Sequence, residues 1–405
     1  MMSTSGRLAL VAAAFFVLAI DPVLSTARAG DGGPVSRRGT YAGGSYLIEV
    51  PAGWNGGLVI FAHGYGEASA SPLGSHLAAN GYAWAASSYR SGDYRPDWFL
   101  EDTLQVRDRF IREIRRPRWT IIHGQSMGGH IAISSLELHP GVYQGALIEC
   151  GVTDGVTVAD LGLAYQAAAE YFAGAPLLDD TARPDLAAWV SELWLPALGE
   201  PGRYTVQGER FDSVVKHLFG GDLPLRLQGL RQRYFPNMIL FRRTQTLGRA
   251  GSTLHVRYRI DPGLGVDEDK LNRRIRRFAP AAGARSRETN SVFAEPTGHI
   301  TVPVLTLHET GDARAPFSLE QSYRRRTLTA GTSHLLVQRA IRWPGHCAID
   351  GDVRERAFDD LVAWIERGVK PDGDTCWQPT CRSWGCDGHR SSTPTIRRDD
   401  VEPWI

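Results

Sequence analysis

The pentapeptide Gly124-Gln125-Ser126-Met127-Gly128 stands between the apolar run 119–122 and a helix-like stretch over 129–139. This setting predicts a strand that turns sharply into a helix, with the serine at the turn. A backbone strained in this way passes too close to its neighbours for side chains, which explains the flanking glycines. A serine hydroxyl becomes a good nucleophile only when it is held exposed beside a base, and such a turn holds it exposed.

Two more polar residues follow predicted strands later in the chain. The run 302–307 reads as a strand and continues into the turn that carries Asp312. The segment 341–343 leads into a tight loop with His346, which precedes an amphipathic helix over 353–368. The sequence therefore presents a serine, an acid and a histidine in that order.

Strands and helices alternate before residue 152, which indicates a mostly parallel sheet covered on both faces. A helix is expected over 100–114. The expected strands of this part are 46–50, 58–62, 82–87, 119–122 and 146–150. Residues 155–298 break this rhythm with alanine-rich and arginine-rich helical patterns. We interpret them as an insertion that forms a cap over the active site.

The chain order Ser126, Asp312, His346, each after a strand, resembles the α/β-hydrolase superfamily. The resemblance covers residues 40–152 and 300–368. Phe61-Ala62-His63-Gly64-Tyr65-Gly66, Gly124 to His130 and Gly345-His346-Cys347 are most similar to secreted bacterial esterases and prolyl-oligopeptidase-type serine hydrolases. The resemblance implies a doubly wound α/β fold with a helical cap, and a serine hydrolase that uses neither a metal nor a cofactor.

In that reading, His346 takes the proton of Ser126 during attack on a carbonyl, and Asp312 fixes the imidazole. The backbone N–H groups of Met127 and Tyr65 would form the oxyanion hole. Tyr65 lies in a glycine-loosened loop that follows the buried strand 58–62.

Other residues compete for two of these roles. Glu309 and Asp350 are alternative acids, but Asp312 lies ahead of a small residue and a proline, as the acid of the superfamily does. His299 precedes the acid and would break the chain order. Three further histidines are expected to be hydrogen-bonded scaffold residues: His63, His123 and His130.

Composition excludes several classes of protein. Hydrophobic residues make up 42% of the chain and charged residues 22%, and the formal net charge is +1. These values are typical of a globular protein with a full core, and they do not indicate a nucleic-acid partner. The arginine cluster at 273–277 could bind an anion, but a solvated charged face is the simpler interpretation.

Residues 1–29 have the pattern of a signal peptide. Arg7 precedes the apolar run 8–20, and Ala27-Arg28-Ala29 fits a cleavage site. We therefore expect a secreted or periplasmic protein without stable membrane association after cleavage; the alternative is an uncleaved anchor.

Five cysteines are present: Cys150, Cys347, Cys376, Cys381 and Cys386. In an oxidising compartment they are expected to form disulfides and to leave one thiol over. Cys347 could pair with Cys150 or with a tail cysteine. Feruloyl esterases and tannases link the cysteine after the histidine to a cysteine just before the serine, but Gln125 stands at that place here. With His389, the tail cysteines could instead form a zinc knuckle.

The expected organisation has five parts: a signal peptide at 1–29, the hydrolase core at 30–154 and 299–370, the cap at 155–298, and a cysteine-containing tail at 371–405. The aromatic residues of the cap are interpreted mainly as its own core, although some could line a substrate pocket. They are Tyr165, Tyr171, Phe172, Trp189, Trp194, Tyr234 and Phe235.

Three functions remain open at this point. The first is hydrolysis of a small-molecule carboxylic ester through an acyl-enzyme intermediate. The second is an amidase or serine peptidase with the same triad, and the third is a catalytically inactive binding protein.

Overall fold

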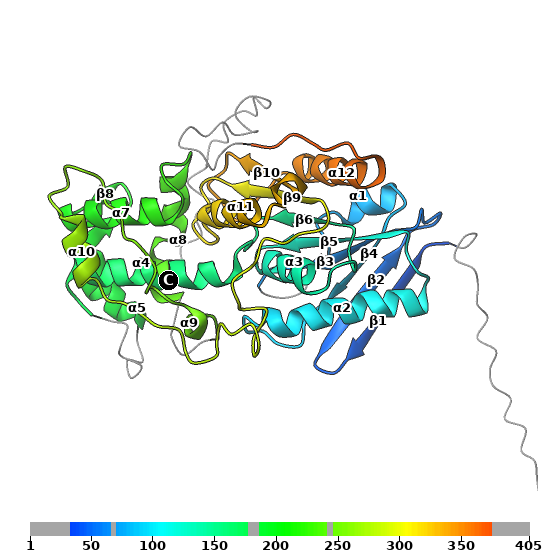
Figure 1. Ribbon diagram of the computed structural model, residues 1–405, viewed down its shortest axis with the longest axis horizontal. Helices are drawn as coiled ribbons and strands as arrows, with labels where there is room; N and C mark the ends of the chain where they lie inside the picture. The colour runs from blue at the N-terminus through cyan, green and yellow to red at the C-terminus, as the bar shows by residue number, and fades with distance from the viewer. Residues whose placement is uncertain (1–32, 66–69, 177–185, 241–245, 375–405) are drawn as a thin grey trace, which may run out of the picture.

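The computed structural model describes residues 33–65, 70–176, 186–240 and 246–374 (Figure 1). The predicted signal peptide at 1–29 and the tail cysteines Cys376, Cys381 and Cys386 lie outside these residues, as does His389. No helix in the described ranges has the length and apolar character needed to cross a membrane.

The main sheet of the described residues has eight strands in the order β1-β2-β4-β3-β5-β6-β9-β10. Strand β2 is antiparallel to both β1 and β4, and the other neighbours are parallel. The strands are β1 (Val35–Tyr41), β2 (Gly44–Val50), β3 (Gly57–Ala62), β4 (Ala83–Ser87), β5 (Trp119–Gln125), β6 (Gly145–Glu149), β9 (Val304–Glu309) and β10 (Leu336–Ile341).

Helices cover both faces of this sheet (Figure 1). They are α1 (Gly74–Ala79), α2 (Pro96–Glu113), α3 (Met127–Leu138), α11 (Ser318–Ala330), α12 (Gly351–Arg367) and the 3₁₀ turn η2 (Ser333–Leu335). Successive residues of β3 enter different cores because side chains alternate along a strand. Leu58 and Ile60 pack in the core that includes residues of α2 and α3, whereas Val59 and Phe61 pack in the core that includes residues of α1 and α12. This doubly wound, mostly parallel sheet confirms the expected α/β-hydrolase fold.

The sequence located most strands but not all of their ends. Strand β1 was not predicted, and of β10 only the last residue fell within the predicted segment 341–343. Strand β9 runs to Glu309, so His308 and Glu309 belong to the strand and not to the turn in which the sequence pattern placed them. Helix α2 begins at Pro96, four residues before the predicted start, because proline suits the first turn of a helix.

Between β6 and β9 the chain forms a helical lobe beside the sheet (Figure 1). Its elements are α4 (Gly155–Ala173), α5 (Leu186–Trp189), the π-helix η1 (Val190–Trp194), α6 (Leu195–Leu198), the short strands β7 (Gly199–Glu200) and β8 (Arg203–Tyr204), α7 (Val206–Leu218), α8 (Arg226–Leu240), α9 (Thr246–Ala250) and α10 (Glu268–Arg274).

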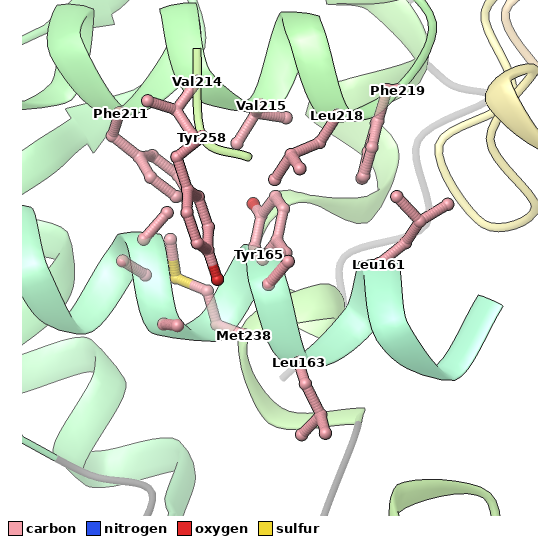
Figure 2. Close-up of a cluster of buried hydrophobic side chains, with 14 of the residues drawn as sticks. Leu161, Leu163, Tyr165, Phe211, Val214, Val215, Leu218, Phe219, Met238 and Tyr258 are labelled. Atoms are coloured by element: carbon pink, nitrogen blue, oxygen red, sulfur yellow. The ribbon is translucent and has the colours of Figure 1, made fainter. Parts of the chain in front are cut away.

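The lobe has a hydrophobic core of its own around α4 (Figure 2). Tyr165 stacks on Phe219 and meets Phe211 edge to face, and Trp194 is fully buried. Four of the seven aromatic residues singled out in the sequence are buried in this cluster: Tyr165, Phe172, Trp194 and Tyr234. The core also includes Ala313 and Ala315, which follow Asp312, so the lobe packs directly on the turn that carries the predicted acid.

Candidate active site

Ser126 lies at the turn between β5 and α3, in a backbone conformation that residues other than glycine seldom adopt. Its φ is 55° and its ψ is −118°. A Cβ at Gly124 would lie 2.5 Å from the carbonyl oxygen of Gly128, and one at Gly128 would lie 1.8 Å from that of Ala62. Glycine is therefore required on both sides of the serine, and the strained turn holds the hydroxyl clear of the backbone.

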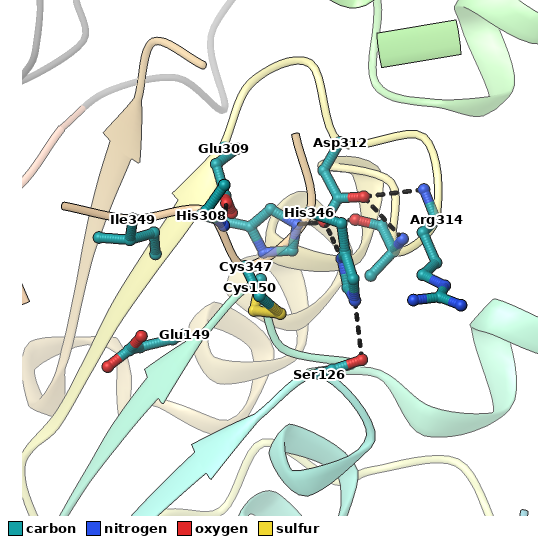
Figure 3. The surroundings of a disulfide bond; sticks show 12 residues. Ser126, Glu149, Cys150, His308, Glu309, Asp312, Arg314, His346, Cys347 and Ile349 are labelled. Atoms are coloured by element: carbon teal, nitrogen blue, oxygen red, sulfur yellow. Dashed lines mark hydrogen bonds and ion pairs between the residues drawn. A yellow bond between two sulfur atoms is a disulfide. The ribbon is translucent and has the colours of Figure 1, made fainter. Parts of the chain in front are cut away.

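The structure brings Ser126, His346 and Asp312 together in one hydrogen-bonded chain (Figure 3). The Ser126 Oγ lies 2.8 Å from His346 Nε2, and His346 Nδ1 lies 2.6 Å from Asp312 Oδ2. The carboxylate can only accept, so His346 Nδ1 donates a hydrogen bond to Asp312, and Nε2 is the ring nitrogen that accepts a hydrogen bond from the serine hydroxyl. The arrangement can therefore activate the hydroxyl.

The backbone of the acid turn orients the Asp312 carboxylate. Asp312 Oδ1 accepts hydrogen bonds from the backbone N–H groups of Arg314 (2.8 Å) and Ala315 (3.0 Å). The aspartate side chain is almost completely buried. Both of its oxygens accept hydrogen bonds from the protein, Oδ1 from the two backbone N–H groups and Oδ2 from His346. The imidazole of His346 thus meets a carboxylate that is fixed in place.

The alternative acid Glu309 has a different role. Its Oε1 accepts a hydrogen bond from the backbone N–H of Ala348 at 2.7 Å, so it supports the loop that follows His346. Burial and the nearby charge of Asp312 raise the pKa of Glu309. Asp350 lies at the start of α12. Of the acids considered in the sequence, Asp312 is the one that contacts His346.

The loop after β3 passes beside the serine. A Cβ at Gly64 would lie 3.0 Å from the Ser126 Cβ, so this loop and the first turn of α3 flank the hydroxyl. Met127 is the first residue of α3, and its N–H therefore has no acceptor within the helix. Tyr65 follows Gly64, and its side chain is exposed. Both predicted oxyanion residues thus adjoin the nucleophile in the chain or in space.

The other histidines make scaffold contacts, as the sequence indicated. His63 Nδ1 lies 2.8 Å from the carbonyl oxygen of Gly64. Burial lowers the pKa of His63. His123 contacts Glu149 at 2.7 Å, and His130 contacts the carbonyl oxygen of Val292 at 2.8 Å.

A disulfide between Cys150 and Cys347 decides the question that the sequence left open (Figure 3). The Cα atoms lie 5.1 Å apart, and 197 residues separate the two cysteines. Both have positive φ values, 45° for Cys150 and 60° for Cys347. The sulfurs and a ring nitrogen of His346 lie within 4.8 Å of one another, but sulfurs bonded to each other offer no thiolate to a metal. The bond ties the histidine loop to the end of β6.

A second histidine near Asp312 was missed in the sequence. His308 is fully buried, with Nδ1 3.2 Å from Glu320 Oε1 and Nε2 2.7 Å from the carbonyl oxygen of Ala315. Its Nε2 is also 3.6 Å from Asp312 Oδ2. Burial lowers the pKa of His308, but the hydrogen bond and charge of Glu320 outweigh burial and raise it to about 9. At neutral pH this raised pKa keeps His308 protonated beside Asp312. Its role can be recognised only from the tertiary contacts.

No protein-family model matches this sequence, and no curated protein sequence matches it. Among solved structures, feruloyl esterase B from Aspergillus oryzae is similar over 84% of this chain and 81% of its own, with 14% identity and a TM-score of 0.48. Acylaminoacyl peptidase from Pyrococcus horikoshii is similar over 85% of this chain at 14% identity and a TM-score of 0.45, and the match spans only 43% of the peptidase. A hormone-sensitive lipase from a metagenome library matches over 85% of this chain and 87% of its own, with 14% identity and a TM-score of 0.41.

Proposed function

We propose that this protein is a serine hydrolase that cleaves carboxylic esters through an acyl-enzyme intermediate. The observation that carries the proposal is the hydrogen-bonded chain from Ser126 through His346 to Asp312. A hydroxyl joined in this way to a base and a carboxylate is the arrangement that nucleophilic acyl transfer requires.

In the proposed cycle, His346 Nε2 accepts the proton as Ser126 Oγ attacks the ester carbonyl. The imidazolium then gives this proton to the leaving alcohol, and the acyl group remains on the serine. Water, deprotonated by the same imidazole, releases the acid and returns the serine to its starting state. Asp312 stabilises the positive ring, and the N–H groups of Met127 and Tyr65 receive the negative oxygen of each tetrahedral intermediate.

The test is hydrolysis of short 4-nitrophenyl esters and labelling by a fluorophosphonate probe. The wild-type protein should turn over the esters and become labelled at Ser126, whereas Ser126→Ala should lose both properties and keep its circular dichroism spectrum. Retained turnover in the variant would refute the assignment. Amides matched to the same esters would reveal an amidase, which the same three residues could support.

We also propose that the protein acts in an oxidising compartment outside the cytosol. The Cys150–Cys347 bond supports this idea, because disulfides persist in such compartments and are rare in the cytosol. Mass spectrometry of the protein from its natural source would test it. A mature chain that begins at Gly30 and contains the bond is expected, and a full-length reduced chain would contradict it.

A further inference from the structure

Helix α8 of the lobe crosses the acid turn with residues spaced four apart. A Cβ at Gly229 would lie 1.7 Å from the carbonyl oxygen of Gly311, so the two backbones touch there. Two helical turns later, Asn237 Nδ2 donates a hydrogen bond to the carbonyl oxygen of Ala313 at 2.8 Å. Residues four apart share one face of a helix, and Arg233 stands between these two contacts. Arg233 therefore faces the turn that carries the catalytic acid.

The guanidinium of Arg233 makes no ion pair or hydrogen bond among the described residues, and its Nε is buried without an acceptor. By contrast, Arg226 on the same helix is paired with Asp212 through two contacts of 2.9 and 2.8 Å. Burial and the positive charge of Arg314 lower the pKa of Arg233 to about 10, which still leaves it charged at neutral pH. The helix thus directs towards the acid turn a charged guanidinium that has no direct partner among the described residues.

Arg314 supplies a second free cation from the acid turn itself. Its backbone N–H holds Asp312, but its exposed side chain makes no ion pair within the described ranges. In Figure 3 this side chain extends from the turn on the same side as the His346 ring, in the direction of Ser126. Arg314 also lines a crevice between the turn and the lobe, together with Leu161, Tyr165, Phe219 and Pro316.

The charge of Asp312 acts on Arg233 and raises its pKa, but among the described residues neither guanidinium forms an ion pair with this carboxylate. One of its oxygens accepts the two backbone N–H groups of the turn, and the other accepts from His346. The positive charges of Arg233 and Arg314 repel each other, and an anion bound by both would relieve this repulsion and satisfy the unmet hydrogen-bonding capacity of Arg233. Guanidinium groups match a carboxylate in geometry as well as in charge.

We propose that Arg233 and Arg314 bind a carboxylate group of the substrate, so that the preferred substrates are esters that carry a negative charge beside an apolar chain. The carboxylate would contact the arginines, and the apolar chain would lie at the mouth of the crevice that Arg314 lines. This assignment builds on the proposed function and names the substrate class of the same site.

The experiment compares kcat/KM for esters that differ only in a carboxylate. On the acyl side, 4-nitrophenyl monoesters of dicarboxylic acids with five to eight carbons are paired with the 4-nitrophenyl esters of monocarboxylic acids of equal length. On the alcohol side, 3-carboxy-4-nitrophenyl butyrate is paired with 4-nitrophenyl butyrate. We expect at least one pair to show a preference of about 10-fold or more for the charged ester.

Arg233→Gln and Arg314→Gln should each lower that preference by about 10- to 100-fold, the loss typical of a charged hydrogen bond. The readout is the ratio of the two rates, because damage to the triad would slow both esters equally and leave the ratio unchanged. Arg231→Gln is the matched control: Arg231 is on the same helix, is exposed and donates to the carbonyl oxygen of Pro201 at 3.1 Å. It removes the same charge and should keep the wild-type ratio.

Two results would overturn the assignment: no preference for any charged ester, or a preference that both variants retain. Arg314 is exposed, so its variant provides the test even if Arg233→Gln unfolds. Hydrolysis of neutral esters through Ser126 without any charge preference would refute this proposal alone. Failure of every ester, or turnover by Ser126→Ala, would instead refute the proposed function.

Discussion

Asp312 and Glu309 are buried carboxyl groups three residues apart, but only Asp312 contacts the His346 ring. The sequence could predict Ser126 and His346 because each depends on a local signal, a glycine-flanked turn or a tight loop before a helix. The choice between the two acids depended on resemblance, since both follow the strand predicted over 302–307. His308 and Arg233 have no local signal at all, because His308 is distinguished by its contact with Glu320 of α11 and Arg233 by the packing of α8 on the acid turn.

Replacing Asp312 by Asn should reduce kcat for ester hydrolysis by about 10³–10⁴-fold, because the amide would favour the wrong tautomer of His346. Glu309→Gln is the control. A glutamine oxygen can still accept from the Ala348 N–H, so this variant should lose less than about 10-fold. Steady-state kinetics on one 4-nitrophenyl ester measures kcat for both variants. Equal losses of kcat in the two variants would contradict the assigned roles.

His308 should make stability depend on pH in the weakly alkaline range. Burial lowers the pKa of His308, but the hydrogen bond of Glu320 and the charges of Glu320, Asp312 and Glu309 raise it to about 9, above the unfolded value of 6.5. This stabilisation is complete below about pH 6.5 and is lost as the pH rises through 9, by at most about 1.4 kcal/mol per pH unit. Glu309 acts in the same direction, because its raised pKa makes the folded state release that proton later than the unfolded chain.

Urea denaturation at intervals from pH 6 to pH 9.5 measures this dependence. Glu320→Gln removes the charge that holds the His308 proton, so its free energy of unfolding should fall less steeply between pH 6.5 and 9 than that of the wild type. Parallel curves for the two proteins would show that His308 is neutral in the folded state.

Among the strands, predictability followed burial. Strands β3, β5 and β6 are buried on both faces, and the apolar runs within them were visible in the sequence. Strand β1, with the sequence VSRRGTY, is largely exposed and polar, so no apolar pattern marked it. It forms through pairing with β2, which is a tertiary contact.

The disulfide joins two elements that hold the site together, the end of β6 and the loop before α12. Glu149, the last residue of β6, is also bound by Arg354 of α12 through contacts of 2.9 and 2.7 Å. These links hold the chain that follows His346 against the end of β6. The sequence left the partner of Cys347 open because a 197-residue separation carries no pairing signal.

Replacing both Cys150 and Cys347 by Ala should lower the free energy of unfolding by about 2–4 kcal/mol, since the bond restricts a long loop of the unfolded chain. Urea denaturation with and without a reductant measures the effect. Reductant should destabilise the wild type towards the double variant and leave the double variant unchanged. Equal stability of oxidised wild type and variant would show that the bond contributes nothing to the fold.

In the molecule as a whole, the insertion could be recognised from the break in the strand rhythm, but its contact with the sheet domain could not. The tightest approach in that contact is at Gly229, where α8 meets both Gly311 and Pro344. A single glycine within a helix gives no indication of its distant neighbour, and only the assembled fold shows why a side chain is excluded there.

Gly229→Ala should therefore impair activity as well as stability. Its Cβ would lie 1.7 Å from the Gly311 oxygen and 2.5 Å from the Pro344 oxygen, so α8 must move away from the two loops that carry Asp312 and His346. We expect a loss of about 1–3 kcal/mol in unfolding free energy, together with a lower kcat/KM. Gly351→Ala, in a helix with open space around it, is the control and should cause neither. Unchanged kinetics in Gly229→Ala would mean that the lobe is not needed to hold the loops.

Ser126 Oγ and His346 Nε2 lie 2.8 Å apart, but 220 residues separate the two in the chain. The ribosome therefore adds His346 long after Ser126. At the usual speed of protein synthesis this distance corresponds to roughly 10–40 s. Throughout that interval the growing polypeptide contains the nucleophile without its base, and under the proposed mechanism it is inert. A ribosome that stops before residue 346 therefore releases a fragment that lacks the triad, and only chains that extend past this residue can hold all three of its members.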